Sequence, residues 1–345
     1  LYLALDDSEA GYSIHKIDVG DFDPDDADDD LDSRPRRPLD SPLLRVEAER
    51  QSANCFVALG TKIFAMQPSS SPGRAAFALD TRTMAITAGP LPQAKEQQLC
   101  ASNFVVVGDR LYSMGERDGD GSCSFEVLGL SSGSRSWSWS SVPSQPLFDP
   151  TYVYSYAVHP DGRTIFFSIP SSHHDLDPPF RRSSRSCDDN GRGATFSFDT
   201  EALKWTFRGY WSLPFYGQGH YDVELDAWVA IHDEFKGARL CCCDVLPPAT
   251  GEDDVDRLQQ APARKLARDR LFRIKGGRRR HRDGALVYMG SSSFCFLERI
   301  TDKVLTWEQL LYVRTFGIKY DNKGRLRMAT CGRRARCYLL PEGTS

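Results

Sequence analysis

The chain has 345 residues, more than one hydrophobic core usually holds, so it forms either two domains or one architecture that grows by repetition. Its formal net charge is -4 and its pI is about 6.0, so the chain as a whole does not attract nucleic acid. No apolar stretch approaches the roughly 18 residues that a membrane helix needs. We therefore expect a soluble protein without membrane association.

The spacing of the cysteines indicates whether they form disulfides or bind a metal, and so in which cellular compartment the protein resides. Among the 10 cysteines there is no C-x-x-C pair and no Cys/His spacing typical of a metal site, so we interpret them as buried reduced thiols. The sequence has no N-x-S/T glycosylation signal, which favours an intracellular protein of the cytoplasm or nucleus. The chain opens at Leu1 and not at Met, so we expect an upstream segment, where a targeting signal would lie out of view.

The first predicted unit has two middle strands and an outer strand, at 1–5, 12–19 and 43–48. An insertion, 20–40, interrupts it and contains the acidic run GDFDPDDADDDLD. Its first aspartates have the spacing of a calcium loop, but Asp26 stands where a glycine is needed and no helices flank the run. We interpret the run as a solvated, disordered insertion without a metal.

A hairpin phrase then recurs along the chain: an apolar run, a tight turn and a second apolar run. Central pairs such as Gly108-Asp109 and Asp161-Gly162 are typical of two-residue hairpin turns. Each copy predicts the first two strands of a unit. The copies lie at 56–66, 104–114, 157–169, 222–231, 283–289 and 317–329.

A second phrase follows the hairpins, with two large apolar residues separated by seven positions and a polar turn, as in FSFDTEALKW. The turn residues supply side-chain acceptors and the second large residue covers the outer strand. We therefore assign repeat-structural roles to Asp80, Asp199, Trp137, Trp205 and Trp307. The aligned copies are Leu79-Asp80-Thr81 with Ile86, Leu130-Ser131-Ser132 with Trp137, Phe198-Asp199-Thr200 with Trp205, and Ile300-Thr301-Asp302 with Trp307.

Together the two phrases define units of four short strands in about 50 residues, a period typical of β-propeller blades. The predicted fold is all-β: a β-propeller of four-stranded antiparallel blades in a single domain over 1–345. Seven blades are favoured because seven such units need about 350 residues, and six blades are the alternative.

The phrase D-T-x-x-x-x-W, coupled to VVVGDRLYSM, resembles the kelch repeat, although its double glycine is mostly absent. The stretches LYLALDDSEAGYSIHKIDV, FALDTRTM and LVYMGSSSFCFLE resemble the kelch-like plant proteins, abundant in grasses, of the domain-of-unknown-function family sixteen-sixty-eight. The resemblance covers nearly the whole chain. It implies a β-propeller and brings no catalytic residue.

Two further insertions carry charge. The insertion 171–193 contains Arg181 and Arg182 before Ser184, a spacing that favours phosphorylation of Ser184. The insertion 247–282 ends in the basic stretch RKLARDRLFRIKGGRRRHR, interpreted first as a solvated loop between blades and second as a patch for nuclear import or an acidic partner. We do not expect nucleic-acid binding, because aromatic interleaving is lacking. The candidate partner-binding residues are Arg278, Arg279, Arg280 and Arg282.

Catalytic chemistry has little support in the sequence. His220 and Tyr221 are the best candidates to approach a central channel, and we interpret them as packed strand residues. There is no G-x-S-x-G, H-E-x-x-H, P-loop or dinucleotide motif, so we assign no catalytic, cofactor-binding or metal residue.

The favoured function is a non-enzymatic scaffold, a monomer that binds a protein partner through its loops. One alternative is an enzyme acting on a small molecule in the central channel. Another is a substrate-recruiting subunit of a ubiquitin ligase. Insertions 20–40 and 171–193 both join second to third strands, so we expect them on one face, with 247–282 on the other. Partner binding is predicted at one of these faces and not in the channel.

Overall fold

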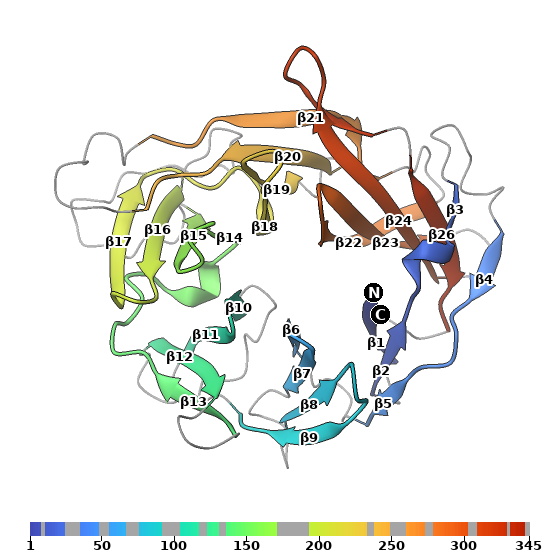
Figure 1. The fold of residues 1–345 in the computed structure, drawn as a ribbon, viewed down its shortest axis with the longest axis horizontal. Helices are drawn as coiled ribbons and strands as arrows, with labels where there is room; N and C mark the ends of the chain where they lie inside the picture. Colours follow the sequence, from blue (N-terminus) through green and yellow to red (C-terminus); the bar gives the residue numbers. More distant parts are fainter. Residues whose placement is uncertain are drawn as a thin grey trace. The chain divides into compact units, whose positions relative to one another are not determined.

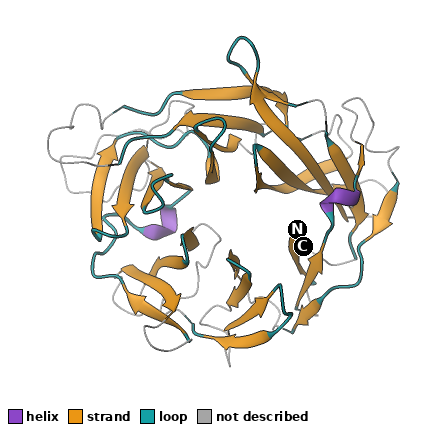
Figure 2. Ribbon diagram, viewed as in Figure 1, coloured by secondary structure: helices purple, strands orange, loops and turns teal. Residues whose placement is uncertain are grey.

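In the part of the chain that it describes, the computed structural model consists mainly of strands, with two short 3-10 helices, η2 (Val19–Asp21) and η6 (Pro150–Tyr152) (Figure 2). Among the described residues, no helix has the length and apolar composition that a membrane crossing requires. The described residues are 1–7, 11–24, 35–47, 55–66, 76–91, 104–116, 123–130, 136–170, 193–232, 238–248, 260–272, 279–302, 309–329 and 332–341.

The chain divides into two compact units. Unit 1 comprises Leu1–Arg50, His220–Asp244 and Ala263–Ser345, and unit 2 comprises Gln51–Gly219 and Val245–Pro262.

Unit 2 holds three sets of four antiparallel strands, each in chain order, and the third set is one half of an eight-stranded sheet (Figure 1). The first consists of β6 (Cys55–Leu59), β7 (Lys62–Met66), β8 (Ala76–Asp80) and β9 (Ile86–Gly89). The second consists of β10 (Phe104–Val107), β11 (Arg110–Glu116), β12 (Cys123–Leu130) and β13 (Trp137–Ser141). The third consists of β14 (Ser155–Val158), β15 (Thr164–Pro170), β16 (Gly193–Asp199) and β17 (Lys204–Gly209).

Unit 1 begins with a three-stranded sheet of β1 (Tyr2–Asp6), β2 (Tyr12–Lys16) and β5 (Leu44–Val46). The other half of the eight-stranded sheet begins with β18 (Tyr216–Asp222), which pairs in parallel with β14 and crosses the unit boundary. It continues with β19 (Ala227–His232), β20 (Arg239–Asp244) and β21 (Arg264–Arg270). The last sheet contains β22 (Arg279–Gly290), β23 (Ser293–Asp302), β24 (Gln309–Tyr320) and β26 (Arg334–Leu339). Three short strands join this sheet, β3 (Asp23–Pro24), β4 (Arg36–Pro38) and β25 (Leu326–Met328).

The described strands thus fall into six antiparallel meanders, five of four strands and one of three. The four-stranded antiparallel meander is the blade of a β-propeller, and the predicted fold class is confirmed. The count matches the six-blade alternative because segment 317–329 is not a blade of its own. β24 is a single 12-residue strand whose first part pairs with β26 and whose last part pairs with β25. Segment 283–289 likewise lies inside the long strand β22 and is not a complete hairpin.

The seven-residue spacing of the second phrase has a direct structural meaning. Its two large residues face each other across the third and fourth strands, as Leu79 with Ile86, Leu130 with Trp137 and Phe198 with Trp205. The carboxylates of Asp80 and Asp199 accept hydrogen bonds from backbone N–H groups two and three residues further on, at 2.9 to 3.2 Å. These bonds close the turn locally. Trp307 lies outside the described residues.

The acidic insertion 20–40 departs from the prediction, because both of its described ends are attached to β26. β3 pairs antiparallel with β26, and β4 pairs with it in parallel (Figure 1). The Arg334 guanidinium donates a hydrogen bond to the Gly20 carbonyl at 2.7 Å, and the Phe22 ring, 2% exposed, packs against Tyr338. The apolar Phe22 therefore anchors an end of the insertion that charge alone would leave in solvent. Residues 25–34 lie outside the described part.

The interpretation of 247–282 as a loop is also wrong in part. Segment 264–270 is strand β21, the last strand of its sheet, and Arg279 begins β22. Ala267 gives the charged strand a buried contact, since its small side chain is 1% exposed and joins the core of unit 1. Four cations of the strand stay exposed, Arg264, Lys265, Arg268 and Arg270. Of insertion 171–193 only Gly193 is described.

Candidate functional site

Strand β21 carries a dense row of positive charge. Arg264, Lys265, Arg268 and Arg270 are all exposed, while Asp269 is the only carboxylate in the strand. A bulge separates the two halves of β21, because Cys241 pairs with Leu266 whereas Arg239 pairs with Arg270.

A second group of cations lies on the hairpin Gly317–Ala329, formed by the end of β24 and by β25. Lys319, Lys323 and Arg325 are exposed and Arg327 is half-buried. Lys319 and Arg327 face each other directly across the two strands. Gly324 has a φ of 67°, a left-handed conformation that favours glycine, so the turn between the strands is built for this residue.

The two groups lie near each other, because the hairpin packs beside β21 within unit 1. Leu326 and Met328 of the hairpin share a hydrophobic core with Ala267 of β21. At the edge of this contact, the Lys265 ammonium nitrogen lies 4.2 Å from the centroid of the Tyr320 ring. We call the cations of β21 and of the hairpin, Arg327 included, the basic surface.

The basic surface holds eight cationic side chains and two carboxylates, although the whole chain has a net charge of -4. The hairpin's own carboxylate, Asp321, is bound by the surrounding N–H groups and by two arginine side chains of the hairpin. Its oxygens accept hydrogen bonds from the backbone N–H groups of Arg325 and Lys323 and from the side chains of Arg325 and Arg327. These bonds, led by the Arg325 N–H, lower the pKa of Asp321 to about 2.

Of the residues that the sequence analysis assigned to a basic patch, Arg279 and Arg280 are paired in β22 opposite Asp302 and Thr301. Arg282 falls at a register shift of the same strand. Arg278 and Ser184 lie outside the described residues, so the patch and the phosphorylation site stay predictions. The sequence analysis found the hairpin 317–329 as a turn but missed its charge, which the composition GIKYDNKGRLRMA already contains.

His220 belongs to a polar cluster that joins two hairpins of unit 1. Its Nε2 donates to the Leu286 carbonyl at 3.2 Å, and its ring stacks on Tyr288. Burial lowers the pKa of His220, which favours the neutral ring. Ser292 donates to the buried Asp222 carboxylate at 2.7 Å, while burial and the Asp222 charge raise the pKa of Tyr288. These contacts tie β18–β19 to β22–β23 and need no ligand.

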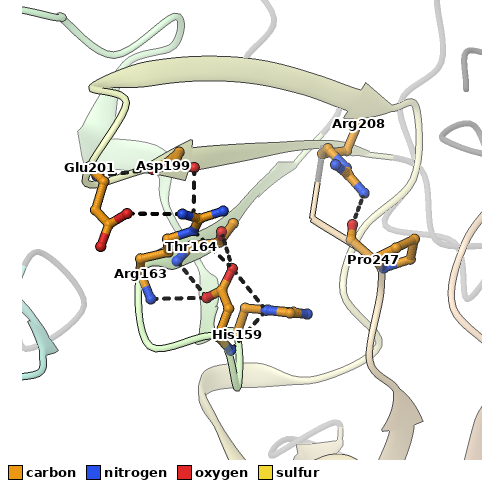
Figure 3. Close-up of polar contacts among 8 residues, drawn as sticks. His159, Arg163, Thr164, Asp199, Glu201, Arg208 and Pro247 are labelled. Carbon is orange, nitrogen blue, oxygen red and sulfur yellow. Dashed lines mark hydrogen bonds and ion pairs between the residues drawn. The ribbon is translucent and has the colours of Figure 1, made fainter. Parts of the chain in front are cut away.

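A comparable network closes the third sheet of unit 2 (Figure 3). The Arg163 guanidinium lies 2.9 Å from Glu201 and 3.7 Å from Asp199, so it links the β14–β15 turn to the β16–β17 turn. Asp161 accepts from Thr164 Oγ1 at 2.7 Å and from two backbone N–H groups, and these bonds lower its pKa against the opposing effect of burial. Asp161 and Asp199 accept backbone N–H groups of their own turns, and Glu201 pairs with Arg163 across the two turns, so the network is structural.

Arg208 fastens the segment that follows β20. Its side chain is 2% exposed, lies 5.1 Å from the centroid of Phe166 and donates a hydrogen bond to the Pro247 carbonyl (Figure 3). This bond holds the described start of insertion 247–282 against the third sheet of unit 2.

The described cysteines are unbridged. Burial raises the pKa of Cys241 and of Cys242 to about 12, so both are protonated thiols at neutral pH. Within the described residues, no group of three or more His, Cys, Asp or Glu side chains is arranged to hold a metal ion.

A family model described as "Protein of unknown function (DUF1668)" matches residues 1–338. The chain belongs to the DUF1668 family. This agrees with the resemblance found in the opening stretch and in the strand phrases. Curated proteins show no significant match to this DUF1668 chain.

Solved structures resemble the DUF1668 chain only distantly. The periplasmic gluconolactonase PpgL of Pseudomonas aeruginosa has 14% identity and a TM-score of 0.48, covering 96% of this chain and 82% of that one. A putative 6-phosphogluconolactonase from Bacteroides fragilis has 10% identity and a TM-score of 0.40, covering 99% and 98%. A chain of the nidogen/laminin complex has 7% identity and a TM-score of 0.43, covering 98% and 97%.

Proposed function

We propose that this DUF1668 protein is a non-enzymatic protein-interaction scaffold, and that the basic surface is a binding surface. The observation that carries the proposal is the concentration of eight cations on β21 and the hairpin in a chain of net negative charge. A local concentration of positive charge on a protein of negative net charge speeds the encounter with a negatively charged partner and orients that partner.

The simplest alternative is that the charges only protect an exposed strand edge. Edge strands often carry Lys and bulges that prevent pairing with another chain, and β21 has both features. That explanation does not extend to the hairpin, where Lys319 and Arg327 face each other in a paired ladder. Like charges opposite each other destabilise a strand pair, so a role outside the ladder accounts for them better.

The test is comparative affinity capture from native tissue with quantitative mass spectrometry. The baits are the unchanged protein, the variant Arg264→Glu/Arg268→Glu/Lys319→Glu/Lys323→Glu, and a control that reverses exposed cations elsewhere, Lys16→Glu/Arg82→Glu/Lys204→Glu. We expect a protein retained by the unchanged and control baits and lost from the first variant. Equal recovery on all three baits would contradict the proposal.

A further inference from the structure

We propose that Asp7, Ser13 and His15 form a proton-operated latch on the three-stranded sheet of unit 1. A proton on His15 keeps the Ser13 hydroxyl bound to Asp7, and loss of that proton turns the hydroxyl away. This inference is independent of the proposed function. It starts from the number of hydrogen atoms available to three neighbouring contacts.

The three contacts follow one another from the end of insertion 20–40 to the end of β1. His15 Nδ1 lies 2.9 Å from the Asp40 carbonyl oxygen, and His15 Nε2 lies 3.0 Å from Ser13 Oγ. Ser13 Oγ donates to Asp7 Oδ1 at 3.0 Å. Ser13 is 1% exposed and His15 is 7% exposed, so solvent has little access to these contacts.

A neutral His15 has too few hydrogens for the three contacts. A carbonyl and a carboxylate only accept, so the Asp40 contact needs a hydrogen on Nδ1 and the Asp7 contact takes the single hydroxyl hydrogen of Ser13. The remaining contact, between Ser13 Oγ and Nε2, then needs a hydrogen on Nε2. Both ring nitrogens donate only in the charged imidazolium, so all three contacts are hydrogen bonds when His15 is protonated.

An alternative places the proton on Asp7, which would then donate to Ser13 while Ser13 donates to a neutral His15. Arg45 weighs against this arrangement, because its Nη1 donates to Asp7 Oδ2 at 2.8 Å. A guanidinium pairs best with an ionised carboxylate. The imidazole is therefore the group that holds the proton.

Loss of the proton removes one of the three hydrogen bonds. If the remaining hydrogen lay on Nε2, the lone pair of Nδ1 would face the lone pairs of the Asp40 carbonyl across 2.9 Å, so the hydrogen stays on Nδ1. Nε2 then becomes an acceptor, and the Ser13 hydroxyl rotates from Asp7 to His15. Asp7 keeps the bond from Arg45 and loses the bond from Ser13.

This change alters how the three strands of the sheet are joined (Figure 1). Asp7 directly follows β1, Ser13 belongs to β2, and the exposed Arg45 belongs to the three-residue strand β5. The protonated latch therefore links all three strands through one carboxylate. A short outer strand opens locally at little cost, so this sheet should open more often as the pH rises through the range in which a histidine loses its proton.

The groups that face the latch from the paired strands are mostly uncharged. Leu3 lies opposite His15 on β1, and Leu5 lies opposite Ser13 on the same strand. On β5, Arg45 lies opposite Ser13, and arginine keeps its charge at every pH of interest.

The core that packs on Leu3 and Leu5 contributes two titratable residues, Cys295 and Tyr338. Burial raises the pKa of Cys295 to about 12 and also raises the pKa of Tyr338, so both stay neutral between pH 5 and 8. The Leu1 amino group is bound to the Ile17 carbonyl at 3.0 Å. His15 is therefore the group of this cluster whose charge changes in that range.

Two measurements test the latch on the full chain. Nitrogen-15 NMR of labelled histidine reports which ring nitrogens carry a hydrogen, and His15→Gln identifies the His15 signals. Hydrogen–deuterium exchange, corrected for the intrinsic effect of pH, reports the opening of residues 2–6, 12–16 and 44–46. The variants are Asp7→Asn and Ser13→Ala, and the control Asp6→Asn removes the neighbouring charge.

We expect both ring nitrogens of His15 to be protonated at the acidic end of the titration, and Nδ1 alone at the basic end. In the unchanged chain and in Asp6→Asn, exchange in the three strands should be at least about threefold faster at pH 7.5 than at pH 5.5. In Asp7→Asn and Ser13→Ala the ratio should fall below about 1.5.

Three results would overturn the latch. One is a neutral His15 with its hydrogen on Nε2, because the Ser13 hydroxyl would then have no reason to turn. Another is corrected exchange that does not depend on pH in the unchanged chain. The third is a pH effect that persists in Asp7→Asn, a variant of the same shape that keeps the test decisive even if Ser13→Ala does not fold.

Discussion

Replacing Trp205 by alanine should destabilise the protein far more than replacing Trp137, although the two residues hold the same position in the repeat. Trp205 is 7% exposed, and its ring centroid lies 4.8 to 5.7 Å from those of four phenylalanines. Its indole N–H also donates to the Ser144 carbonyl at 3.2 Å. Trp137 is half-buried and has Phe64 as its ring contact, at 5.3 Å.

The magnitudes follow from these surroundings. Truncating a buried Trp to Ala costs about 3 to 5 kcal/mol, and the orphaned Ser144 carbonyl adds about 1 kcal/mol. Trp137→Ala removes roughly half as much buried area and should cost about 1 to 2 kcal/mol. Trp205→Phe keeps a ring but loses the hydrogen bond and some volume, so its cost should fall between the two, at about 3 kcal/mol.

The assay is guanidinium unfolding of the three variants, followed by far-ultraviolet circular dichroism and by tyrosine fluorescence, with free energies compared at a common m-value. The expected order of destabilisation is Trp205→Ala, then Trp205→Phe, then Trp137→Ala. A Trp137→Ala variant as unstable as Trp205→Ala would refute the reasoning, because it would mean that repeat position and not local packing decides the cost.

Other consequences are open to measurement. Hydrogen bonds from the Arg82 N–H and from Lys62 lower the pKa of Asp80 to about 2. The ionised carboxylate therefore stabilises the fold above the unfolded pKa near 4, and this contribution is lost as the pH falls toward 2. Asp80→Asn should flatten the dependence of stability on pH in that range, as measured by thermal unfolding. Asp321→Asn keeps a turn acceptor and removes the charge that competes for Arg325 and Arg327, so an acidic peptide should bind about threefold tighter in a titration, and weaker binding would contradict this role. Cys241 and Cys242 should resist iodoacetamide at pH 8 until the chain unfolds, as followed by peptide mass mapping.

The parts of the fold that could be predicted from sequence are those that depend on neighbours in the chain. The turns at Asp80 and Asp199 close through hydrogen bonds to the next two or three residues, so their phrase contains all the information required. Leu130 opposite Trp137 and Phe198 opposite Trp205 follow from the same short segment. The blade was therefore accessible from spacing alone.

The parts that escaped prediction depend on pairing between distant segments. The sequence around Phe22 does not predict the hydrogen bond between Gly20 and Arg334, which lie 314 positions apart. An acidic run taken by itself indicates a solvated loop. The extent of β24 was hidden for the same reason, since its two halves pair with different strands.

The basic surface was only half visible in the sequence. The charges of 264–270 are evident in the sequence, but so many charged residues favour a loop over a strand. The hairpin 317–329 is evident from its turn residues, whereas its charge is not part of the hairpin pattern. Their meeting depends on the packing of Ala267 with Leu326 and Met328, which only the folded chain brings together.

The most direct test of the central claim is zero-length carbodiimide cross-linking of the protein to a partner recovered by affinity capture, because this reagent joins carboxylates to lysine amines in contact. Three lysines, Lys265, Lys319 and Lys323, belong to the basic surface, and the exposed Lys16 and Lys204 lie elsewhere in the sequence and serve as internal controls. The account predicts cross-linked peptides that join Asp or Glu residues of the partner to Lys265, Lys319 or Lys323. Cross-links confined to Lys16 or Lys204 would contradict it.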